Sequence, residues 1–520
     1  MSIARTLALI LVLGLNGALH AQDGVPDLAW GTMGGAQTYF CGICRSGSSG
    51  GIMFDDQGRV LISGWVSEGL LPPSSVYAVR YTTDGQVDST FGEYGVAEGT
   101  FCTSDDVVKD MDIGPDGSIY ICGYEDWGLS LQPDPIAVLR WTEDGQIDET
   151  FGPAGVRAML LGEYTRANTM VALPDGKVLL GGTYCGTSGD FCPMVLIRLT
   201  HDGALDTTFG PGTGWIDHQY WTGNASISEL MPQPDGRFLA VGYGGPNIYV
   251  LRFLSDGTLD STFDTDGMLP LAAQANTQDG DIHLSADGRI TVFIRQAASH
   301  RIFRFWPDGS PDLSYGVGGV AEIPNTLVGG QFSAMLPDGR VLLSRGNPNV
   351  RGILCVANDG TIDADFGVDG YALPVLGDQW GYAGALAVGP DQRFVSATTA
   401  PSQHWAAETW DMAAYMFLAD SVADQTVAIE VTERSAPALF PSPYSGGALW
   451  LSVSPALRTM RWTIVDDSGR DVRDLPYTPA SAAVAVDISP YVADLAPGCY
   501  LLCGTGTTGE RSAQRFMVMH

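Results

Sequence analysis

The sequence predicts an all-β fold: a seven-bladed β-propeller followed by a small immunoglobulin-like β-sandwich. Each blade is expected to hold four antiparallel strands, with the ring closed by N- and C-terminal segments. Three observations predict this fold. One turn motif recurs seven times, a second turn motif recurs seven times between its copies, and 66 glycines with 30 prolines interrupt every helix-length apolar pattern.

The N-terminus begins with an apolar run from Leu7 to Leu15, which follows Arg5 and precedes a stretch of small residues ending at Ala21. The run is too short to span a bilayer comfortably and is typical of a signal peptide. We therefore expect residues 1–21 to be a signal peptide cleaved near Ala21, and the mature protein to be secreted or held at the outer membrane or cell surface. The alternative is an ordinary buried segment.

The first repeated motif is Asp-Gly-x-x-Asp-x-x-aromatic-Gly. Its copies are Asp23 to Gly31, Asp84 to Gly92, Asp144 to Gly152, Asp202 to Gly210, Asp308 to Gly316 and Asp359 to Gly367, with Asp256 to Asp264 lacking only the last glycine. Glycine supplies the positive φ of a tight turn, and the preceding aspartate bonds nearby backbone amides. These aspartates are therefore expected to be turn residues first.

The second motif is Pro-Asp-Gly before an apolar run. Its copies are Pro115-Asp116-Gly117, Pro174-Asp175-Gly176, Pro234-Asp235-Gly236 and Pro337-Asp338-Gly339, with degenerate members at Asp56-Gln57-Gly58, Ala286-Asp287-Gly288 and Pro390-Asp391-Gln392. The repeat period is 51 to 61 residues, and each unit holds about four short alternating runs. Four antiparallel strands with hairpin turns make one blade, so residues 22–422 are predicted to form the propeller.

The two ends of the repeat region are incomplete in complementary ways. The first motif copy, Asp23 to Gly31, lacks the strand that precedes every other copy, and the last unit ends with an orphan strand, Ala413 to Leu418. Joined, the two pieces make one blade and remove an open sheet edge. This favours seven blades over six or eight.

The units resemble the delta-60 family of β-propeller repeats found in bacterial surface proteins. The segment Leu205 to Gly210 best matches the family's Leu-Asp-x-x-Phe-Gly core, and Pro311, Tyr315 and Asp264 depart from it in single units. The resemblance implies a propeller and usually no assigned activity. Five arginines share one strand position and are expected to pair with repeat carboxylates: Arg80, Arg140, Arg198, Arg252 and Arg304.

Beyond a linker at residues 423–436, short alternating runs predict a β-sandwich over residues 437–520. Its predicted strands are Leu449 to Val453, Met460 to Val465, Ala483 to Ile488, Cys499 to Cys503 and Arg515 to Val518. The region resembles the C-terminal sorting domain of the type IX secretion system of Bacteroidetes. The resemblance implies recognition by that translocon through matching motifs that contain Pro441, Pro443, Gly469, Gly498, Tyr500 and Arg515. The alternative is an accessory sandwich without a sorting role.

Export would place the nine cysteines in an oxidising compartment, where close pairs can form disulfides. The candidate pairs are Cys41/Cys44, Cys102/Cys122 and Cys185/Cys192. Cys499 and Cys503 lie too far apart along one predicted strand to bridge each other. With an odd total, at least one thiol stays unpaired.

No motif predicts catalysis, a metal site or a cofactor. Gly47-Ser48-Ser49-Gly50-Gly51 fits a nucleophile-elbow pattern without the strand-turn-helix that the elbow needs, and Asp264-Thr265-Asp266-Gly267 is half of a calcium loop without the remaining ligands. Acidic residues outnumber basic ones by 59 to 27, giving a net charge of −32 that repels nucleic acid. We therefore expect no enzyme activity and no nucleic-acid partner.

Both turn series should emerge at one end of the disc, so the variable connections should emerge at the opposite end. Aromatic residues in or near those connections could form a recognition face: Trp65, Trp127, Tyr184, Phe191, Tyr243, Trp405 and Trp410. We expect a monomeric, non-enzymatic scaffold that binds an extracellular glycan, peptide or protein through this face. The alternatives are an extracellular hydrolase or lyase, a structural envelope protein, and a purely packing role for the aromatic residues.

Overall fold

The computed structural model divides the chain into two compact units, residues 1–423 and 424–520. It describes residues 24–27, 29–31, 35–38, 44–68, 74–101, 105–126, 135–162, 164–186, 191–221, 223–271, 280–296, 299–324, 332–344, 352–373, 383–401, 410–419, 438–440, 450–452, 461–466, 471–474, 485–487, 498–505 and 511–518. The predicted signal peptide and linker lie outside the described residues.

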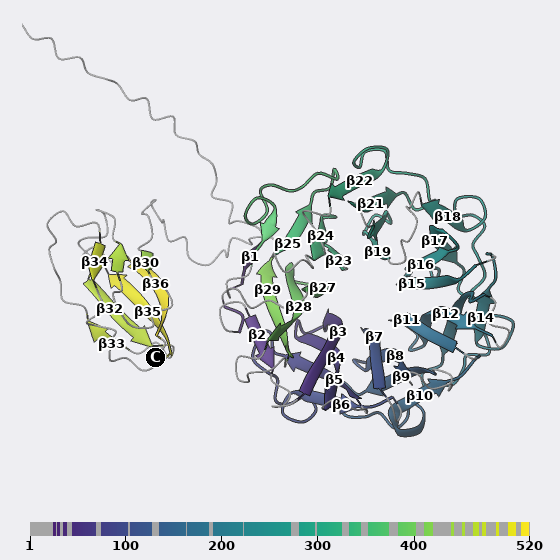
Figure 1. Ribbon diagram of the computed structural model, residues 1–520, viewed down its shortest axis with the longest axis horizontal. Coiled ribbons are helices and arrows are strands. Elements are labelled where there is room, and N and C mark those ends of the chain that lie inside the picture. Colours follow the sequence, from purple (N-terminus) through teal and green to yellow (C-terminus); the bar gives the residue numbers. More distant parts are fainter. Residues whose placement is uncertain are drawn as a thin grey trace, which may run out of the picture. The chain divides into compact units, whose positions relative to one another are not determined.

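The first unit is a ring of seven antiparallel sheets arranged about a common centre (Figure 1). Blades 1 to 3 are formed by β3 (Cys44–Phe54), β4 (Val60–Glu68), β5 (Ser74–Tyr81) and β6 (Val96–Gly99); β7 (Asp105–Ile113), β8 (Ile119–Asp126), β9 (Ile136–Trp141) and β10 (Val156–Met159); and β11 (Tyr164–Ala172), β12 (Val178–Cys185), β13 (Met194–Leu199) and β14 (Trp215–His218). A single 3-10 turn, η1 (Pro153–Gly155), precedes β10.

Blades 4 to 6 repeat this arrangement. They are formed by β15 (Ala225–Pro232), β16 (Phe238–Gly244), β17 (Asn247–Phe253) and β18 (Met268–Leu271); β19 (Gly280–Leu284), β20 (Ile290–Ile294), β21 (Ser299–Phe305) and β22 (Val320–Pro324); and β23 (Ser333–Met335), β24 (Val341–Ser344), β25 (Ile353–Val356) and β26 (Tyr371–Ala372). The prediction of seven blades with four antiparallel strands is confirmed.

Blade 7 combines strands from both ends of the repeat region. It contains β27 (Ala383–Val388), β28 (Arg393–Pro401) and β29 (Trp410–Leu418), with β1 (Val25–Pro26) and β2 (Gly35–Thr38) both paired to β29. The register joins Val25 to Leu418 and Gly35 to Tyr415. The orphan strand recognised in the sequence therefore has N-terminal partners.

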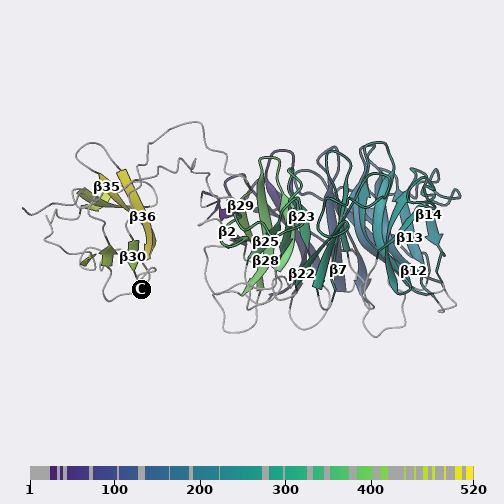
Figure 2. The ribbon, with the colours of Figure 1, turned by 90° about the horizontal axis from the view of Figure 1, so that it is seen from above.

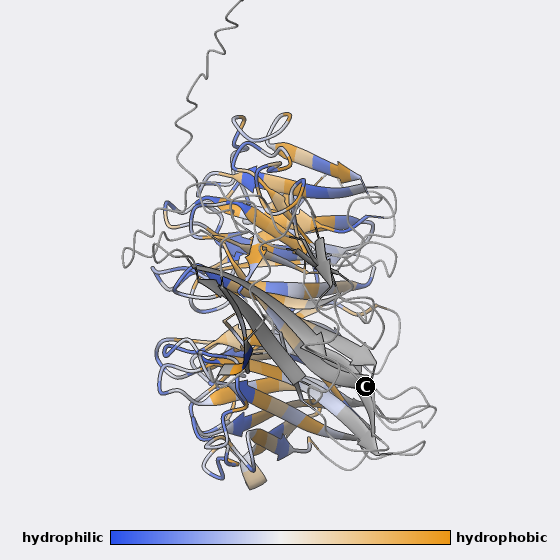
Figure 3. Ribbon diagram, turned by 90° about the vertical axis from the view of Figure 1, so that its left-hand side faces the viewer, coloured by the Kyte–Doolittle hydropathy of each residue, from blue (hydrophilic) through white to orange (hydrophobic). Residues whose placement is uncertain are grey.

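The two Asp-Gly turns of a blade join its first strand to its second and its third strand to its fourth, so antiparallel pairing places both at one end of the disc, here called the turn face. The opposite end is called the variable-loop face (Figure 2). In the turn of blade 2, Asp116 Oδ1 accepts a hydrogen bond from Ser118 N at 3.1 Å, and Gly117 has φ 78°. Hydrophilic residues mark these turns, whereas apolar residues concentrate in the strands (Figure 3). The turn role predicted for the aspartates follows directly from this geometry.

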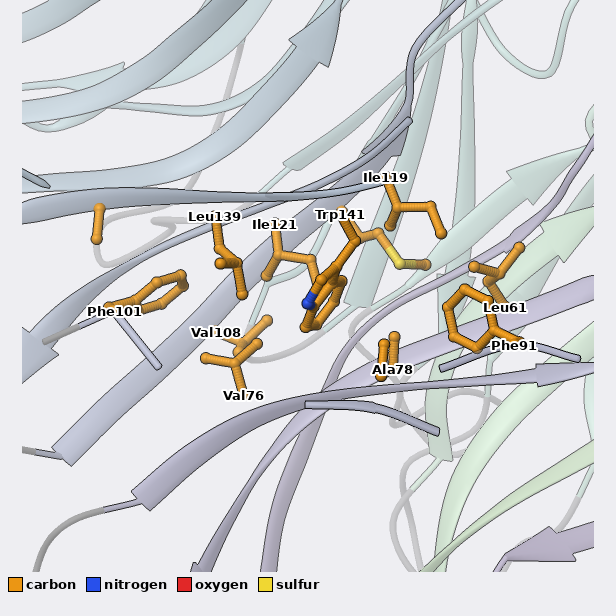
Figure 4. Packing of buried hydrophobic residues seen from close by; sticks show 13 residues of the cluster. Leu61, Val76, Ala78, Phe91, Phe101, Val108, Ile119, Ile121, Leu139 and Trp141 are labelled. Atoms are coloured by element: carbon orange, nitrogen blue, oxygen red, sulfur yellow. The ribbon is translucent and has the colours of Figure 1, made fainter. Parts of the chain in front are cut away.

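The apolar core lies between neighbouring blades. Leu61, Phe91 and Ala78 of blade 1 face Ile121 and Trp141 of blade 2, and all five are fully or almost fully buried (Figure 4). Similar clusters occupy the other junctions. Because each cluster takes side chains from two blades, a blade cannot bury its apolar faces alone.

The repeated arginines join neighbouring blades. Nε of Arg80, Arg198 and Arg252 lies 2.7 to 2.8 Å from the aspartate of its own motif copy, and Arg140 Nε lies 3.2 Å from Asp148. The predicted pairing is confirmed for these four residues. Each arginine of the series also donates from NH1 to a backbone oxygen in the next blade: Glu143, His201, Ser255, Pro307 and Asn358.

Blades 6 and 7 lack an arginine at this strand position, where Cys355 and Met416 stand instead. In these two blades, the arginine that follows the Pro-Asp-Gly turn or its degenerate form bonds the backbone oxygen of the next blade instead. Arg340 NH2 donates to Ala419 O at 3.0 Å, and Arg393 NH1 donates to Thr83 O of blade 1 at 3.1 Å. An arginine therefore bonds a backbone oxygen across each of the seven blade junctions.

The second unit contains two antiparallel sheets. They comprise β30 (Ala438–Phe440), β31 (Trp450–Ser452) and β34 (Ala485–Asp487), and β32 (Arg461–Asp466), β33 (Asp471–Asp474), β35 (Gly498–Thr505) and β36 (Arg511–Val518). Strands form within or across all five predicted runs. In the described parts of both units, no helix is long and apolar enough to cross a bilayer.

Candidate functional site

Several aromatic residues of the predicted recognition face pack against the blade cores. Trp65, Tyr184 and Tyr243 are partly buried against the clusters between blades 1 and 2, 2 and 3, and 4 and 5, respectively. Phe191, in contrast, is 57% exposed. Trp127 and Trp405 lie outside the described residues, and of Trp410 the structure describes only its place in β29.

A second set of aromatic side chains lies on the same face at the junction of blades 3 and 4, and the sequence analysis identified only Phe191 among its members. We call Phe191, Tyr220, Trp221 and Tyr249 the rim cluster. The ring of Tyr220 contacts Trp221 at 5.7 Å, and Trp221 contacts Tyr249 at 4.9 Å between centroids. Tyr220 is 44% exposed, so this group presents aromatic surface to solvent.

Short connections leave the rim cluster uncovered. Residues 245 and 246 alone link β16 to β17, and Gly245 takes the positive φ of 59° that so tight a hairpin needs. A Cβ atom on Gly244 would lie only 2.3 Å from the ring of Trp221, so this glycine lets the indole pack directly on the hairpin backbone. The Gly-Gly pair is the sequence signal that could have located the cluster.

A disulfide holds the loop that carries Phe191 next to the segment that follows Trp221. Cys185 and Cys192 are bonded, as predicted. Cys192 N donates to Asn224 Oδ1 at 3.1 Å, and Ala225 N donates to Cys192 O at 2.7 Å, which ties the loop of blade 3 to the first strand of blade 4. The predicted pair Cys102–Cys122 is wrong, because Cys122 is a free, buried thiol.

Polar groups surround the rim cluster. Exposed amides are present on Gln219, Asn224 and Asn247. Beneath them, His218 stacks on Tyr220 at 5.3 Å, and its Nδ1 lies 3.0 Å from the tyrosine hydroxyl. Burial lowers the pKa of His218 to about 4, so its ring is neutral at physiological pH. The site thus combines exposed aromatic rings with amide and imidazole groups, beside the carboxylate of Asp217, which accepts from Gln219 Nε2 at 2.6 Å.

A polar group of a different kind lies between the first strands of blades 5 and 6. Ser333 Oγ is 2.8 Å from both His283 Nε2 and Asp281 Oδ2, and Ser333 N also donates to Asp281 Oδ2 at 2.6 Å. The serine is only 8% exposed, and these bonds join two blades. We interpret the group as a structural junction. The 50 residues between His283 and Ser333 concealed it from motif analysis.

A hollow of about 670 Å³ opens on the turn face between blades 4 and 5. In blade 2, Glu143 accepts bonds from Arg59 and Gln57 of blade 1, but the equivalent residue of blade 5 is Pro307, which cannot bridge the gap. The charged side chains that line the hollow already have partners, because Arg237 and Arg252 both bind Asp260. The hollow therefore offers a ligand little unsatisfied charge.

Within the described residues, no group of three His, Cys, Asp or Glu side chains could hold a metal ion. The half calcium loop serves a turn instead. Asp264 takes the positive φ of 50° at the place of the missing glycine, and Asp266 Oδ1 accepts a hydrogen bond from Met268 N at 3.0 Å.

Comparison with known proteins agrees with the repeat and the fold. Residues 58–91, 173–209 and 233–263 match the family described as "Domain of unknown function (DUF5122) beta-propeller", to which delta-60-like repeats belong. No curated protein matches the chain.

Solved structures with some likeness include a fungal alcohol oxidase of the AA5 family in complex with copper, at 12% identity and TM-score 0.39, covering 94% of this chain and 99% of that one. Polysaccharide lyase Uly1 shows 9% identity and TM-score 0.41, covering 75% and 93%. Prolyl oligopeptidase B from Galerina marginata shows 9% identity and TM-score 0.40, covering 90% and 56%. Likeness at this level carries no argument about activity.

Proposed function

We propose that this protein is an extracellular, non-enzymatic binding scaffold whose variable-loop face holds a neutral glycan at the rim cluster. The observation that carries the proposal is the exposure of Phe191 and Tyr220 beside a two-residue hairpin that leaves their rings uncovered. Exposed aromatic side chains are costly to leave in water and supply much binding energy at low entropic cost.

The surrounding chemistry favours a sugar over other ligands. Aromatic faces pack against the C–H groups of sugar rings. The exposed amides of Gln219, Asn224 and Asn247 keep hydrogen-bonding capacity for hydroxyl groups beyond their bonds to Asp217, Cys192 and Tyr249. The net charge of −32 disfavours anionic polysaccharides. A neutral glycan satisfies all three features.

Replacing Tyr220 by alanine is expected to weaken binding to the best neutral oligosaccharide of a glycan array by about tenfold or more, since loss of a hot-spot aromatic costs upwards of ~1.4 kcal/mol. Affinity is measured by calorimetry on the full chain. Tyr94→Ala is the matched control, because Tyr94 is an 82% exposed tyrosine in a turn-face loop. Equal loss in both variants, or selective binding of peptides instead of glycans, would contradict the proposal.

The proposal includes export through a signal peptide at residues 1–21 and a type IX sorting domain at residues 437–520. Support comes from the motif resemblance and from strands at the expected positions. Tyr500 and Arg515 lie on paired strands β35 and β36, where Tyr500 faces Phe516 and Leu501 faces Arg515. Gly498 begins β35, whereas Pro441, Pro443 and Gly469 lie outside the described residues.

In a host that possesses the type IX apparatus, we expect the full chain to reach the surface, to begin near Gln22 and to lose its C-terminal region. A chain lacking residues 437–520 should remain in the periplasm. Cell fractionation and terminal masses measure both outcomes. Equal export of the two chains would make the second unit an accessory domain.

We also propose that the N-terminal segment closes the propeller ring. Three contacts support this closure: β1 and β2 pair with β29, Gly31 N donates to Asp84 O of blade 1 at 2.7 Å, and Asp27 Oδ2 lies 3.5 Å from Arg393 NH1 of blade 7.

A further inference from the structure

The innermost strand of each blade has an edge without a strand partner. Among the described residues, these strands, which include β7, β11, β15, β19 and β23, pair only with the second strand of their own blade and lie nearest the centre of the ring (Figure 1). Backbone amides on such an edge need acceptors from elsewhere if they are withdrawn from water.

Side chains from the preceding blade supply these acceptors along an arc from blade 2 to blade 6. Asp110 accepts from Met170 N at 2.8 Å, and Thr169 accepts from Leu230 N at 3.3 Å. At the next two junctions, Glu229 accepts from Ile282 N at 2.6 Å, and Asp281 accepts from Ser333 N at 2.6 Å. Asp112 adds a second bond beside Asp110, to Ala172 N at 2.7 Å.

The four residues occupy one position of the repeat. Asp110, Thr169, Glu229 and Asp281 each precede the aspartate of their own second turn motif by six residues. The equivalent residues of blades 1, 6 and 7 are Gly51, Phe332 and Ala385, whose side chains cannot accept a hydrogen bond. The ring is therefore joined by this contact over only part of its circumference.

We infer that this arc, which we call the inner seam, is a proton-binding site: its carboxyl groups hold the inner strands together while they carry protons, and the ring loosens as they release them. The inference rests on geometry, because Asp110, Asp112, Glu229 and Asp281 are partly buried carboxyl groups that all accept backbone hydrogen bonds along the inner strands of blades 2 to 6. Ionisation of all four would place like charges along one wall of the ring.

The titratable surroundings of Glu229 support this inference. Burial raises its pKa well above the usual range, and the carboxyl groups of Asp281 and Asp110 add to the rise. His283, on the strand next to Glu229, is neutral because burial lowers its pKa to about 4. The basic side chains of the neighbouring inner strands, Lys109 and Arg166, both lie over the ring of Tyr124.

Two further acids of the inner seam, Asp110 and Asp112, behave alike. Burial raises the pKa of Asp110 to about 7, with a further contribution from Asp112, and burial raises the pKa of Asp112 to about 6. Unfolded carboxyl groups titrate near pH 4, so between that value and the folded pKa the folded ring holds protons that the unfolded chain has lost. Stability must then fall as the pH rises.

The pH window from 6.5 to 8.0 isolates this effect. Below it, the buried neutral rings of His218 and His283 act in the opposite sense, because unfolded histidines bind protons up to about pH 6.5. Above it, the raised pKa of the Cys122 thiol begins to contribute. Between pH 6.5 and 8.0, we expect proton release from Glu229 to make the largest contribution to the loss of stability, with Asp110 contributing up to about pH 7.

The test follows the thermal midpoint of the full chain across this window. We expect a fall of about 2 °C per pH unit for each proton that the folded ring retains. Glu229→Gln keeps an oxygen to accept from Ile282 N but has no proton to lose, so its midpoint should fall clearly less. Glu98→Gln, which changes an exposed acid bonded to the Tyr77 hydroxyl, should follow the unmodified chain.

A midpoint that is level or rises from pH 6.5 to 8.0 overturns the inference, as does a Glu229→Gln chain that keeps the whole decline. If that variant does not fold, proton exchange on unfolding the unmodified chain in urea at pH 7 decides the matter. Release of protons into a weakly buffered indicator solution supports the inner seam, and no release overturns it. Neither readout involves the rim cluster, so this inference stands or falls separately from glycan binding.

Discussion

Replacing Asp260 by alanine should lower the free energy of unfolding of the propeller by about 3–5 kcal/mol, the usual cost of removing one partner from a buried ion pair. Asp260 is 4% exposed, and its carboxylate accepts from Arg252 Nε at 2.8 Å and from Arg237 NH1 at 2.9 Å. Without it, two guanidinium groups remain at the blade junction, and Arg252 is itself almost fully buried. Urea unfolding followed by tryptophan fluorescence measures the loss.

Asp308→Ala is the matched control, since Asp308 is an exposed turn aspartate whose carboxylate accepts from Ser310 within its own turn. Its loss should have a much smaller effect. A change at Asp260 no larger than the change at Asp308 would mean that the repeated Arg–Asp pairs contribute little to stability.

Asp260→Ala should also change how the free energy of unfolding falls at low pH. Burial alone would raise the pKa of Asp260, but hydrogen bonds from Thr262 and the guanidinium groups of Arg237 and Arg252 hold it well below the usual range. A lowered folded pKa gives stability that is present above about pH 4 and lost as the pH falls. The alanine variant should therefore lose less stability on acidification than the unmodified chain.

Trp30→Ala should also cost about 3–5 kcal/mol, the range for truncating a large buried aromatic side chain. Trp30 is 1% exposed and lies in a cluster with Tyr81 of blade 1 and Val395 and Met416 of blade 7, with its ring 5.9 Å from that of Tyr81. If the N-terminal segment closes the ring, this single residue joins both blades. Urea unfolding and the rate of proteolysis near residue 24 should both report the loss.

Trp306→Ala provides the control of equal size, because Trp306 is 44% exposed on the turn of blade 5. A Trp30→Ala chain as stable as this control would show that the ring holds without its N-terminal segment. Such a result would overturn the closure proposal while leaving the seven sheets unchanged.

Repetition explains why so much of the fold could be predicted. Gly117, with its positive φ, and Asp116, with its bond to Ser118 N, act within a few residues, so each motif copy carries its own turn chemistry. The recurrence of Arg80 and its equivalents at one strand position likewise indicated a structural pairing, which Asp88 provides in blade 1.

Contacts between blades could not be predicted in the same way. Trp65, Tyr184 and Tyr243 alternate with residues on the other face of their strands, and the neighbouring blade decides which face is covered. Arg340 and Arg393 replace the missing strand arginines of blades 6 and 7, a substitution that becomes visible only when the next turn lies beside them.

By itself, the sequence determined the strands, the turns and the number of blades, because these follow from local conformational preference and from a repeat that can be counted. The tertiary structure alone decided which groups meet across junctions: Trp221 with Tyr249 beside Gly244, Glu229 with Ile282, and Ser333 with His283. These partners are up to about a whole blade apart in sequence, and only the curvature of the ring brings them within hydrogen-bonding or packing distance.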